Sequence, residues 1–147
     1  MKKYRLENVT SQPDLWSGRD PVRPELGVKF KTAPGRGVFG LVNREGSYKA
    51  FLCFARTTDV PRTVSELKTL TSESGEIIIP YTVWSNEKGA GREIVNEVIK
   101  LIGISKTASR VVTLSPLTEM ARKFHIRNNA SEFRINESTV NFEYEVV

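Results

Sequence analysis

The chain has 147 residues, of which 39% are hydrophobic and 27% are charged. This length and balance suit a compact globular domain, and they exclude a disordered tail and a bundle of membrane spans. The formal net charge is +5, from 22 basic and 17 acidic residues. Because these charges are dispersed and no aromatic-basic motif occurs, we expect no nucleic-acid partner; a smaller phosphate-bearing ligand suits the charge.

The single cysteine, Cys53, excludes an intramolecular disulfide and favours a reducing compartment. Residues 4–8 supply no apolar signal segment, and no apolar run approaches the roughly 20 residues of a membrane span. We therefore expect a cytoplasmic protein that does not contact a membrane. Asp14, Asp20 and Asp59 form no evident metal-binding pattern, so we expect neither a metal nor a prosthetic group.

The first half of the chain is expected to be mainly strands. Residues 1–25 are polar and interrupted by prolines, which indicates an arm or a short helix, and the alternation in residues 26–30 predicts a first strand. The other predicted elements are a β-hairpin of residues 38–42 and 48–55, a short helix with Val64, Leu67 and Leu70 at intervals of three, and a buried strand over residues 76–82.

The second half alternates helices with strands. The clearest helix covers residues 92–102, and Gly103 is expected to end it. The remaining elements are a strand over 110–114, a helix over 116–127 with Met120, Ala121 and Phe124 inward, and a hairpin of 133–135 and 139–146. This order predicts a mixed α/β sheet with helices packed on it. The last strand is long enough to pair edge to edge with a second copy, which would give a homodimer.

The segment from Asn86 to Arg92 joins the buried strand to the clearest helix. The first turn of a helix leaves backbone N–H groups unpaired and carries a partial positive charge. Gly89 and Gly91 would let a phosphate approach the backbone, and Lys88 and Arg92 add positive charge. The spacing matches neither a P-loop nor a dinucleotide-binding fingerprint, and a tight strand-to-helix turn is the alternative interpretation.

The order and spacing of the elements resemble the GNAT acyltransferase fold, which carries Arg/Gln-x-x-Gly-x-Gly/Ala at this junction. The resemblance implies a central twisted, mostly antiparallel sheet flanked by helices. It further implies that strands 76–84 and 110–114 splay apart, so that the arm of an acyl-CoA inserts between them. The residues it assigns to acyl-CoA binding are Asn86, Glu87, Lys88, Gly89, Ala90, Gly91 and Arg92, together with Tyr81, Thr82 and Val83.

Ser115 and His125 are the candidate catalytic residues. His125 is the only histidine, and histidine is the usual proton carrier at neutral pH. Each residue also has a purely structural interpretation. Ser115 and Pro116 suit the N-cap and first position of a helix, and His125 suits a half-buried position near a helix C-terminus, where the dipole favours its cation.

Residues 37–146 also resemble the catalytic domain of malonyl-CoA decarboxylases, a variant of the GNAT fold. Thr113–Pro116 resembles its Thr-Leu-Ser-Pro, and Phe124–Ala130 resembles its Phe-His-Leu-x-Asn-Gly-Ala, with Asn129 in place of glycine. Further matches are Arg134-Ile135-Asn136, Asn141-Phe142-Glu143-Tyr144 and Tyr81 to Gly91. The resemblance makes Ser115 and His125 a catalytic pair. It implies one GNAT-like domain over 1–147, in which residues 1–36 are an arm in place of the family's helical domain.

The function implied is the conversion of malonyl-CoA to acetyl-CoA and CO₂. Ser115 would hydrogen-bond the thioester carbonyl, and His125 would orient the substrate and help deliver the proton. One alternative is a GNAT N-acyltransferase that moves an acetyl group from acetyl-CoA to a small amine, with Glu119 or Glu76 as the base. A third is a non-catalytic acyl-CoA-binding module. We expect Glu119 and Glu76 to lie on solvated faces, and Trp16, Trp84 and Cys53 to be packing residues.

Overall fold

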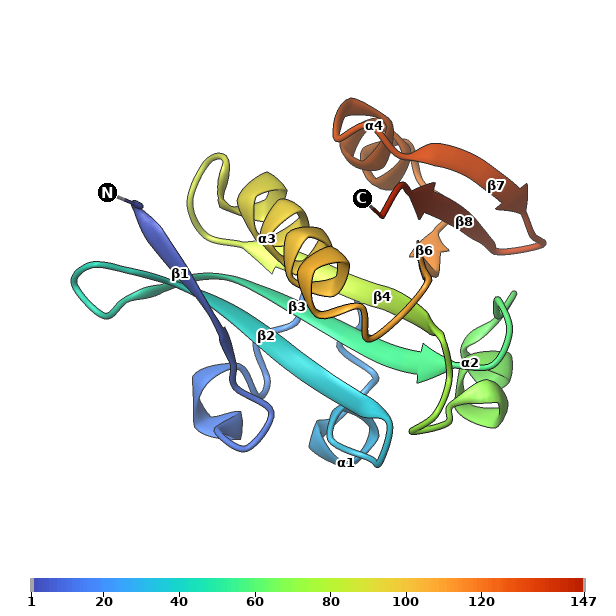
Figure 1. The fold of residues 1–147 in the computed structure, drawn as a ribbon, viewed down its shortest axis with the longest axis horizontal. Coiled ribbons are helices and arrows are strands. Elements are labelled where there is room, and N and C mark those ends of the chain that lie inside the picture. Colours follow the sequence, from blue (N-terminus) through green and yellow to red (C-terminus); the bar gives the residue numbers. More distant parts are fainter. Residues whose placement is uncertain (1, 147) are drawn as a thin grey trace.

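Strand pairing in the computed structural model, which describes residues 2–146, joins eight strands into one mixed sheet (Figure 1). The order is β1-β2-β3-β4-β5-β8-β6, and β7 pairs with β8. All pairs are antiparallel except β4 with β5. The strands are β1 (Tyr4–Asn8), β2 (Arg36–Asn43), β3 (Tyr48–Thr57), β4 (Ile77–Ser85), β5 (Arg110–Val112), β6 (Ser115–Pro116), β7 (Ser131–Ile135) and β8 (Thr139–Tyr144). This confirms the predicted fold class.

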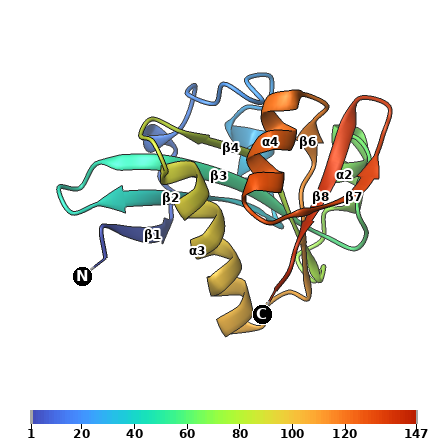
Figure 2. The ribbon, with the colours of Figure 1, turned by 90° about the horizontal axis from the view of Figure 1, so that it is seen from above.

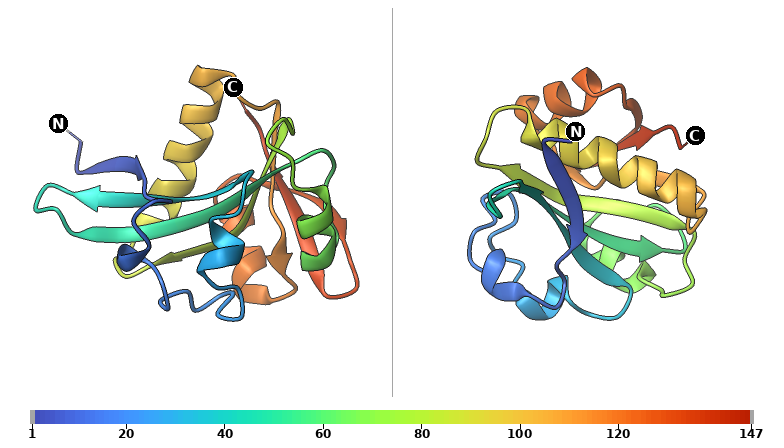
Figure 3. Two further views of the ribbon diagram at one scale, coloured as in Figure 1. Left: turned by 90° about the horizontal axis from the view of Figure 1, so that it is seen from below. Right: turned by 60° about the vertical axis from the view of Figure 1, so that its left-hand side comes forward.

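Helices cover both faces of this sheet (Figures 2 and 3). They are the 3₁₀ turn η1 (Pro13–Leu15), α1 (Val28–Lys31), α2 (Val64–Leu70), α3 (Ala90–Ser105) and α4 (Glu119–Arg127). One apolar core lies between the sheet and α3, around Ile94, Val98 and Phe142. The other lies under the N-terminal arm, around Trp16 and Leu114. None of the helices within residues 2–146 combines the length and apolarity that a membrane crossing requires.

The hairpin of β2 and β3 follows the prediction closely. The side-chain oxygen of Asn43 accepts hydrogen bonds from the backbone of Glu45 and Ser47, and Gly46 takes the left-handed φ of 84° that closes the loop. The predicted short helix is also confirmed as α2. Thr63 caps it by accepting a hydrogen bond from the Glu66 N–H at 3.0 Å.

The N-terminal arm differs from the prediction in two places. It contains an edge strand, β1, which pairs with β2 from Tyr4↔Asn43 to Asn8↔Phe39. The strand predicted at 26–30 is wrong, because α1 forms there instead. In α1 the consecutive residues Phe30 and Lys31 both pack inward, which the alternating geometry of a strand does not allow.

The long helix α3 extends further than predicted. Its buried face contains Ile94, Val95, Val98 and Ile102, as the periodicity indicates. Gly103 does not end the helix; the helix continues to Ser105, and Lys106 adopts the left-handed conformation that terminates it. The Lys106 N–H donates to the Ile102 carbonyl and closes the last turn of the helix. This turn includes Gly103, although glycine has a low helix propensity.

The expected dimer edge is not an edge. β8 lies between β7 on one side and β5 and β6 on the other, so its backbone is already paired within the chain. In the described part of the chain, β1 and β7 each have an unpaired edge, and so do β6 and the C-terminal half of β4 where they face each other. The prediction failed because an alternating apolar strand has the same pattern at an edge as in the interior of a one-sided sheet.

Candidate functional site

The parallel strands β4 and β5 separate soon after they begin to pair. Their ladder contains only Ile77↔Arg110 and Ile78↔Val111, and the Leu114 N–H makes a last bond of 3.1 Å to the Pro80 carbonyl. Beyond that point β4 continues beside β3, whereas the chain after β5 stays paired with β8, through β6 (Figure 1). The predicted splay of the two central strands is therefore confirmed.

A cleft of about 410 Å³ lies where the strands part. Its walls are β4, β6, α4 and two residues of the arm, and most of its lining is apolar. The lining residues are Pro21, Val22, Pro80, Tyr81, Thr82, Val83, Ser115, Pro116, Thr118, Met120, Ala121, Phe124 and His125. Both candidate catalytic residues line this one cleft, although they come from β6 and from the end of α4.

The wall formed by β4 contains a β-bulge. The register with β3 passes from Cys53↔Thr82 to Phe54↔Pro80, so Tyr81 has no partner. The Tyr81 ring packs edge-on against Phe30, and the Thr82 hydroxyl donates to Asp20 at 2.9 Å. The side chains of Tyr81 and Thr82 face the arm, so these two residues line the cleft with their backbone atoms.

Arg23 of the arm holds the two parting strands at the point of separation. Its Nε donates to the Tyr81 carbonyl at 3.3 Å and its Nη2 to the Leu114 carbonyl at 3.0 Å, so two buried carbonyls that have lost their sheet partners are satisfied. The arm is fixed in turn by Asp20, whose carboxylate accepts the Arg23 N–H at 2.9 Å and the Lys31 ammonium at 2.8 Å. Sequence analysis missed this role of Arg23, because no motif links it to β4 or β6.

Ser115 does not cap the helix that follows it. The capping residue of α4 is Thr118, whose hydroxyl accepts the Ala121 N–H at 3.2 Å, so the N-cap interpretation of Ser115 is wrong. Ser115 is buried in β6, and its hydroxyl donates to Thr113 Oγ1 at 2.8 Å. The same Thr113 oxygen accepts the Phe142 N–H at 3.0 Å, which fixes the hydroxyl pair against β8.

His125 is buried in the last turn of α4 among aromatic rings. Its ring stacks on Phe142 at 5.1 Å, and Phe124 and Tyr144 meet it edge-on. Its Nδ1 lies 2.6 Å from the Tyr144 hydroxyl. Burial lowers the pKa of His125 from 6.5 to about 4. The imidazole is therefore neutral at pH 7, and the helix C-terminus does not stabilise a cation there as one structural interpretation supposed.

The buried imidazole predicts a loss of stability in mild acid. The pKa of His125 is about 4 in the folded chain and about 6.5 when exposed, so the unfolded chain takes up the proton first as the pH falls through this window. We expect the free energy of unfolding to drop by about 2 kcal/mol between pH 7 and pH 5. Urea titrations at both pH values measure this drop. In His125→Gln it should largely disappear, and an undiminished drop in that variant would contradict the assignment.

The first turn of α3, which follows the glycine loop, is left open because no side chain caps it. Gly89 is the N-cap residue, with a left-handed φ of 85°. Lys88 and Arg92 are exposed beside it. Two other predicted ligands point elsewhere: Asn86 donates to the Tyr48 carbonyl at 3.4 Å, and Glu87 accepts from the Tyr4 hydroxyl.

Gly91 connects this loop to the cleft. A Cβ atom at Gly91 would lie 3.3 Å from the ring of Phe124, a lining residue, and 3.5 Å from the Ser85 hydroxyl at the end of β4. The first turn of α3 therefore lies directly against the cleft wall. An elongated ligand with an anionic part at the loop and an apolar part in the cleft would follow the C-terminal half of β4.

The structure also shows where the two glutamates, the predicted packing residues and Met120 lie. Glu119 and Glu76 are exposed and neither lines the cleft, as expected of solvated residues. Trp16 and Cys53 are fully packed, and Trp84 packs on the Phe51 ring. The inward position predicted for Met120 is wrong. Its side chain is 83% exposed at the cleft, because α4 covers a groove and not a closed core.

Comparison with known proteins gives matches only to solved structures: no family model and no curated protein matches the chain. The GNAT-like decarboxylase GphF in complex with isobutyryl-CoA superposes with a TM-score of 0.75 at 16% identity, covering 97% of this chain and 100% of that one. Malonyl-CoA decarboxylase from Cupriavidus metallidurans gives 0.67 at 13% identity, covering 97% of this chain and 61% of that one. The GNAT domain of PAT from S. lividans gives 0.64 at 11% identity, covering 96% and 89%.

Proposed function

We propose that the chain binds an acyl-CoA, with the pyrophosphate at the open first turn of α3 and the acyl group in the cleft. Its fold is the GNAT fold, and its structural neighbours include both decarboxylases and acetyltransferases. The charge of Lys88 and Arg92, the uncapped helix start and the free edge of β4 support this placement. The amides of the pantetheine arm would hydrogen-bond to the backbone of β4 beyond Pro80, as an added strand does.

Within this proposal, the reaction is the decarboxylation of malonyl-CoA. The observation that carries it is a cleft whose lining includes Ser115 and a neutral His125 and no carboxylate. An amine acceptor would need a base to remove its proton, and the two glutamates considered for that role lie outside the cleft. Decarboxylation needs no such base.

Decarboxylation of malonyl-CoA takes up one proton from solvent. The bond between the carboxylate carbon and the α-carbon breaks, CO₂ leaves, and the electron pair forms an enolate whose charge develops on the thioester oxygen. A hydroxyl or N–H donor aimed at this oxygen stabilises the transition state. The α-carbon then takes up a proton from water to give acetyl-CoA. In an apolar cleft the departing carboxylate is poorly hydrated, which favours the loss of its charge.

Mass spectrometry of malonyl-CoA incubated with the pure protein tests this proposal. We expect conversion to acetyl-CoA, with turnover reduced about 100-fold in Ser115→Ala and in His125→Ala, because each variant removes a polar group at the developing oxyanion. Ser131→Ala, which alters an exposed serine on β7, is the matched control and should retain full turnover.

Calorimetry with CoA separates binding from catalysis. Lys88→Ala/Arg92→Ala should weaken CoA binding, whereas Ser115→Ala should bind normally. Intact malonyl-CoA together with CoA binding would overturn the decarboxylase assignment; acyl transfer would then be tested with acetyl-CoA and a library of small amines. Binding without turnover in either assay would indicate an acyl-CoA-binding module.

A further inference from the structure

The hydrogen bond between His125 and Tyr144 leaves the imidazole with one free nitrogen. Nδ1 is occupied by the Tyr144 hydroxyl at 2.6 Å. Phe142 stacks on the ring, Phe124 and Tyr144 contact it in T-shaped geometry, and His125 also lines the cleft. A neutral imidazole has one nitrogen that donates and one that accepts, so the direction of the Tyr144 bond decides what Nε2 offers to a ligand.

The burial of Tyr144 determines that direction. Its side chain is 4% exposed, and its hydroxyl forms its hydrogen bond with His125 Nδ1. Asn128, which follows α4, is also buried, but its Nδ2 has no hydrogen-bond partner among residues 2–146. A buried O–H requires an acceptor, and Nδ1 is the acceptor at this contact.

The proton of Tyr144 must then go to His125. The Tyr144 O–H donates to Nδ1, so Nδ1 itself carries no proton. In the opposite direction Nδ1–H would donate to the phenol oxygen, and the buried phenol proton would lack an acceptor. That arrangement leaves a buried donor unsatisfied and is disfavoured.

We propose that Tyr144 is a positioning residue that keeps His125 as the neutral tautomer with its proton on Nε2. His125 then presents an Nε2–H donor to the cleft that Ser115 also lines. This inference rests on the proposed function and makes it more specific: His125 donates a hydrogen bond to the thioester oxygen and does not transfer a proton. A transfer from the neutral ring would leave an imidazolate, so the proton that reaches the α-carbon comes from water.

Nitrogen-15 NMR of the ligand-free protein tests the tautomer without any assay of activity. The chain has one histidine, so a long-range ¹H–¹⁵N spectrum of the labelled protein contains a single imidazole. At pH 7 we expect a protonated, pyrrole-type Nε2 and an unprotonated, pyridine-type Nδ1. A proton on Nδ1, equal populations of the two tautomers or an imidazolium would overturn the proposal, whatever the protein does to malonyl-CoA.

Two variants test the role of the tyrosine. In Tyr144→Phe the hydroxyl is lost, so the tautomers should mix, and kcat for decarboxylation should fall about 10-fold with little change in KM. Asn128→Ala should keep the Nε2–H tautomer, because the Asn128 Nδ2 has no hydrogen-bond partner in the described part of the chain. Tyr48→Phe is the matched control, because it removes a phenol that bonds to Glu7 at 2.5 Å, away from the cleft.

The outcomes of the variants are separable from those of the assay. If Nε2–H remains fully populated in Tyr144→Phe, the positioning role of the tyrosine is wrong even when the wild type shows that tautomer. Loss of Nε2–H in Asn128→Ala would also contradict it. If Tyr144→Phe shifts the tautomers but malonyl-CoA stays intact in the wild type, the proposed function fails and the hydrogen bond from Tyr144 to His125 stands. Circular dichroism shows whether each variant is folded, and only folded variants are compared with the wild type.

Discussion

Asp20→Ala should lower the free energy of unfolding by about 3–5 kcal/mol, the largest effect of any single substitution predicted here. Asp20 is 5% exposed, and its carboxylate accepts the Lys31 ammonium at 2.8 Å and the Thr82 hydroxyl at 2.9 Å. Its removal leaves the buried Lys31 without a counter-charge. The backbone turn that presents Arg23 to the parting strands loses its anchor as well.

Chemical denaturation of three proteins checks this prediction. The double variant Asp20→Asn/Lys31→Met should recover part of the loss, because removing both charges abolishes the penalty of an unpaired buried ion. Arg5→Ala breaks an exposed ion pair with Glu7 and should cost less than about 1 kcal/mol. Equal losses for Asp20→Ala and Arg5→Ala would show that the buried pair does not stabilise the arm.

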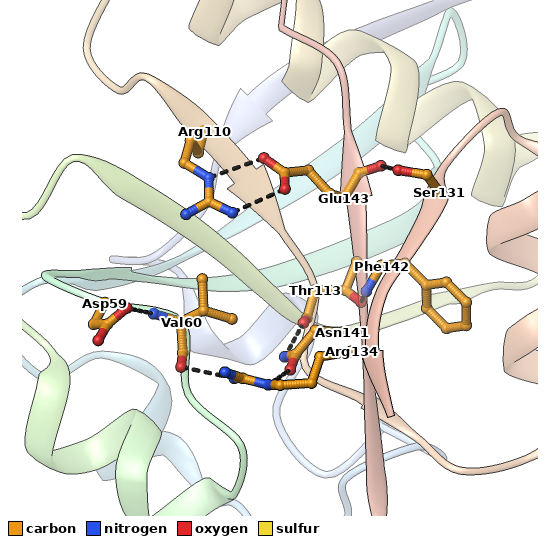
Figure 4. A network of polar contacts seen from close by, with 9 residues as sticks. All are labelled: Asp59, Val60, Arg110, Thr113, Ser131, Arg134, Asn141, Phe142 and Glu143. Carbon is orange, nitrogen blue, oxygen red and sulfur yellow. Dashed lines mark hydrogen bonds and ion pairs between the residues drawn. The ribbon is translucent and has the colours of Figure 1, made fainter. Parts of the chain in front are cut away.

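Asn141→Ala should lower the free energy of unfolding by about 2–4 kcal/mol. Asn141 is fully buried in β8, and its Nδ2 donates to the carbonyls of Pro61 at 2.9 Å and Thr113 at 2.8 Å. Its Oδ1 accepts from Arg134 Nε at 3.2 Å and from Asn136 at 2.9 Å. Figure 4 shows Asn141 and Arg134 bridging the segment between β5 and β6 that carries Thr113 and the loop that carries Val60.

The loss at Asn141 should also reach the cleft. Phe142 and Tyr144 follow it on β8 and hold the His125 ring, and Thr113 holds the Ser115 hydroxyl. We therefore expect Asn141→Ala to reduce the melting temperature and the turnover together. Asn96→Ala, an exposed amide on α3, is the matched control and should change neither. A variant with normal turnover and a reduced melting temperature would show that the network stabilises the hairpin without positioning the site.

Much of the local structure follows from short-range signals in the sequence. The polar loop ending in Gly46 predicts the β2–β3 hairpin, and the apolar positions 94, 95, 98 and 102 predict the buried face of α3. The errors at α1, Gly103 and β8 occur where packing outweighs local preference. A strand pattern at 26–30 becomes a helix once Phe30 and Lys31 have partners under β4.

The sequence by itself determined which residues could perform chemistry: the single histidine, the serine before Pro116 and the two glycines at the start of α3. The tertiary structure alone decided how they are held. Arg23 lies 91 residues from the Leu114 carbonyl that it satisfies, and Tyr144 lies 19 residues from His125. Such contacts leave no periodic pattern, because each arises where two elements meet after folding. The tautomer and the pKa of His125 depend on these tertiary contacts and not on its neighbours in the chain.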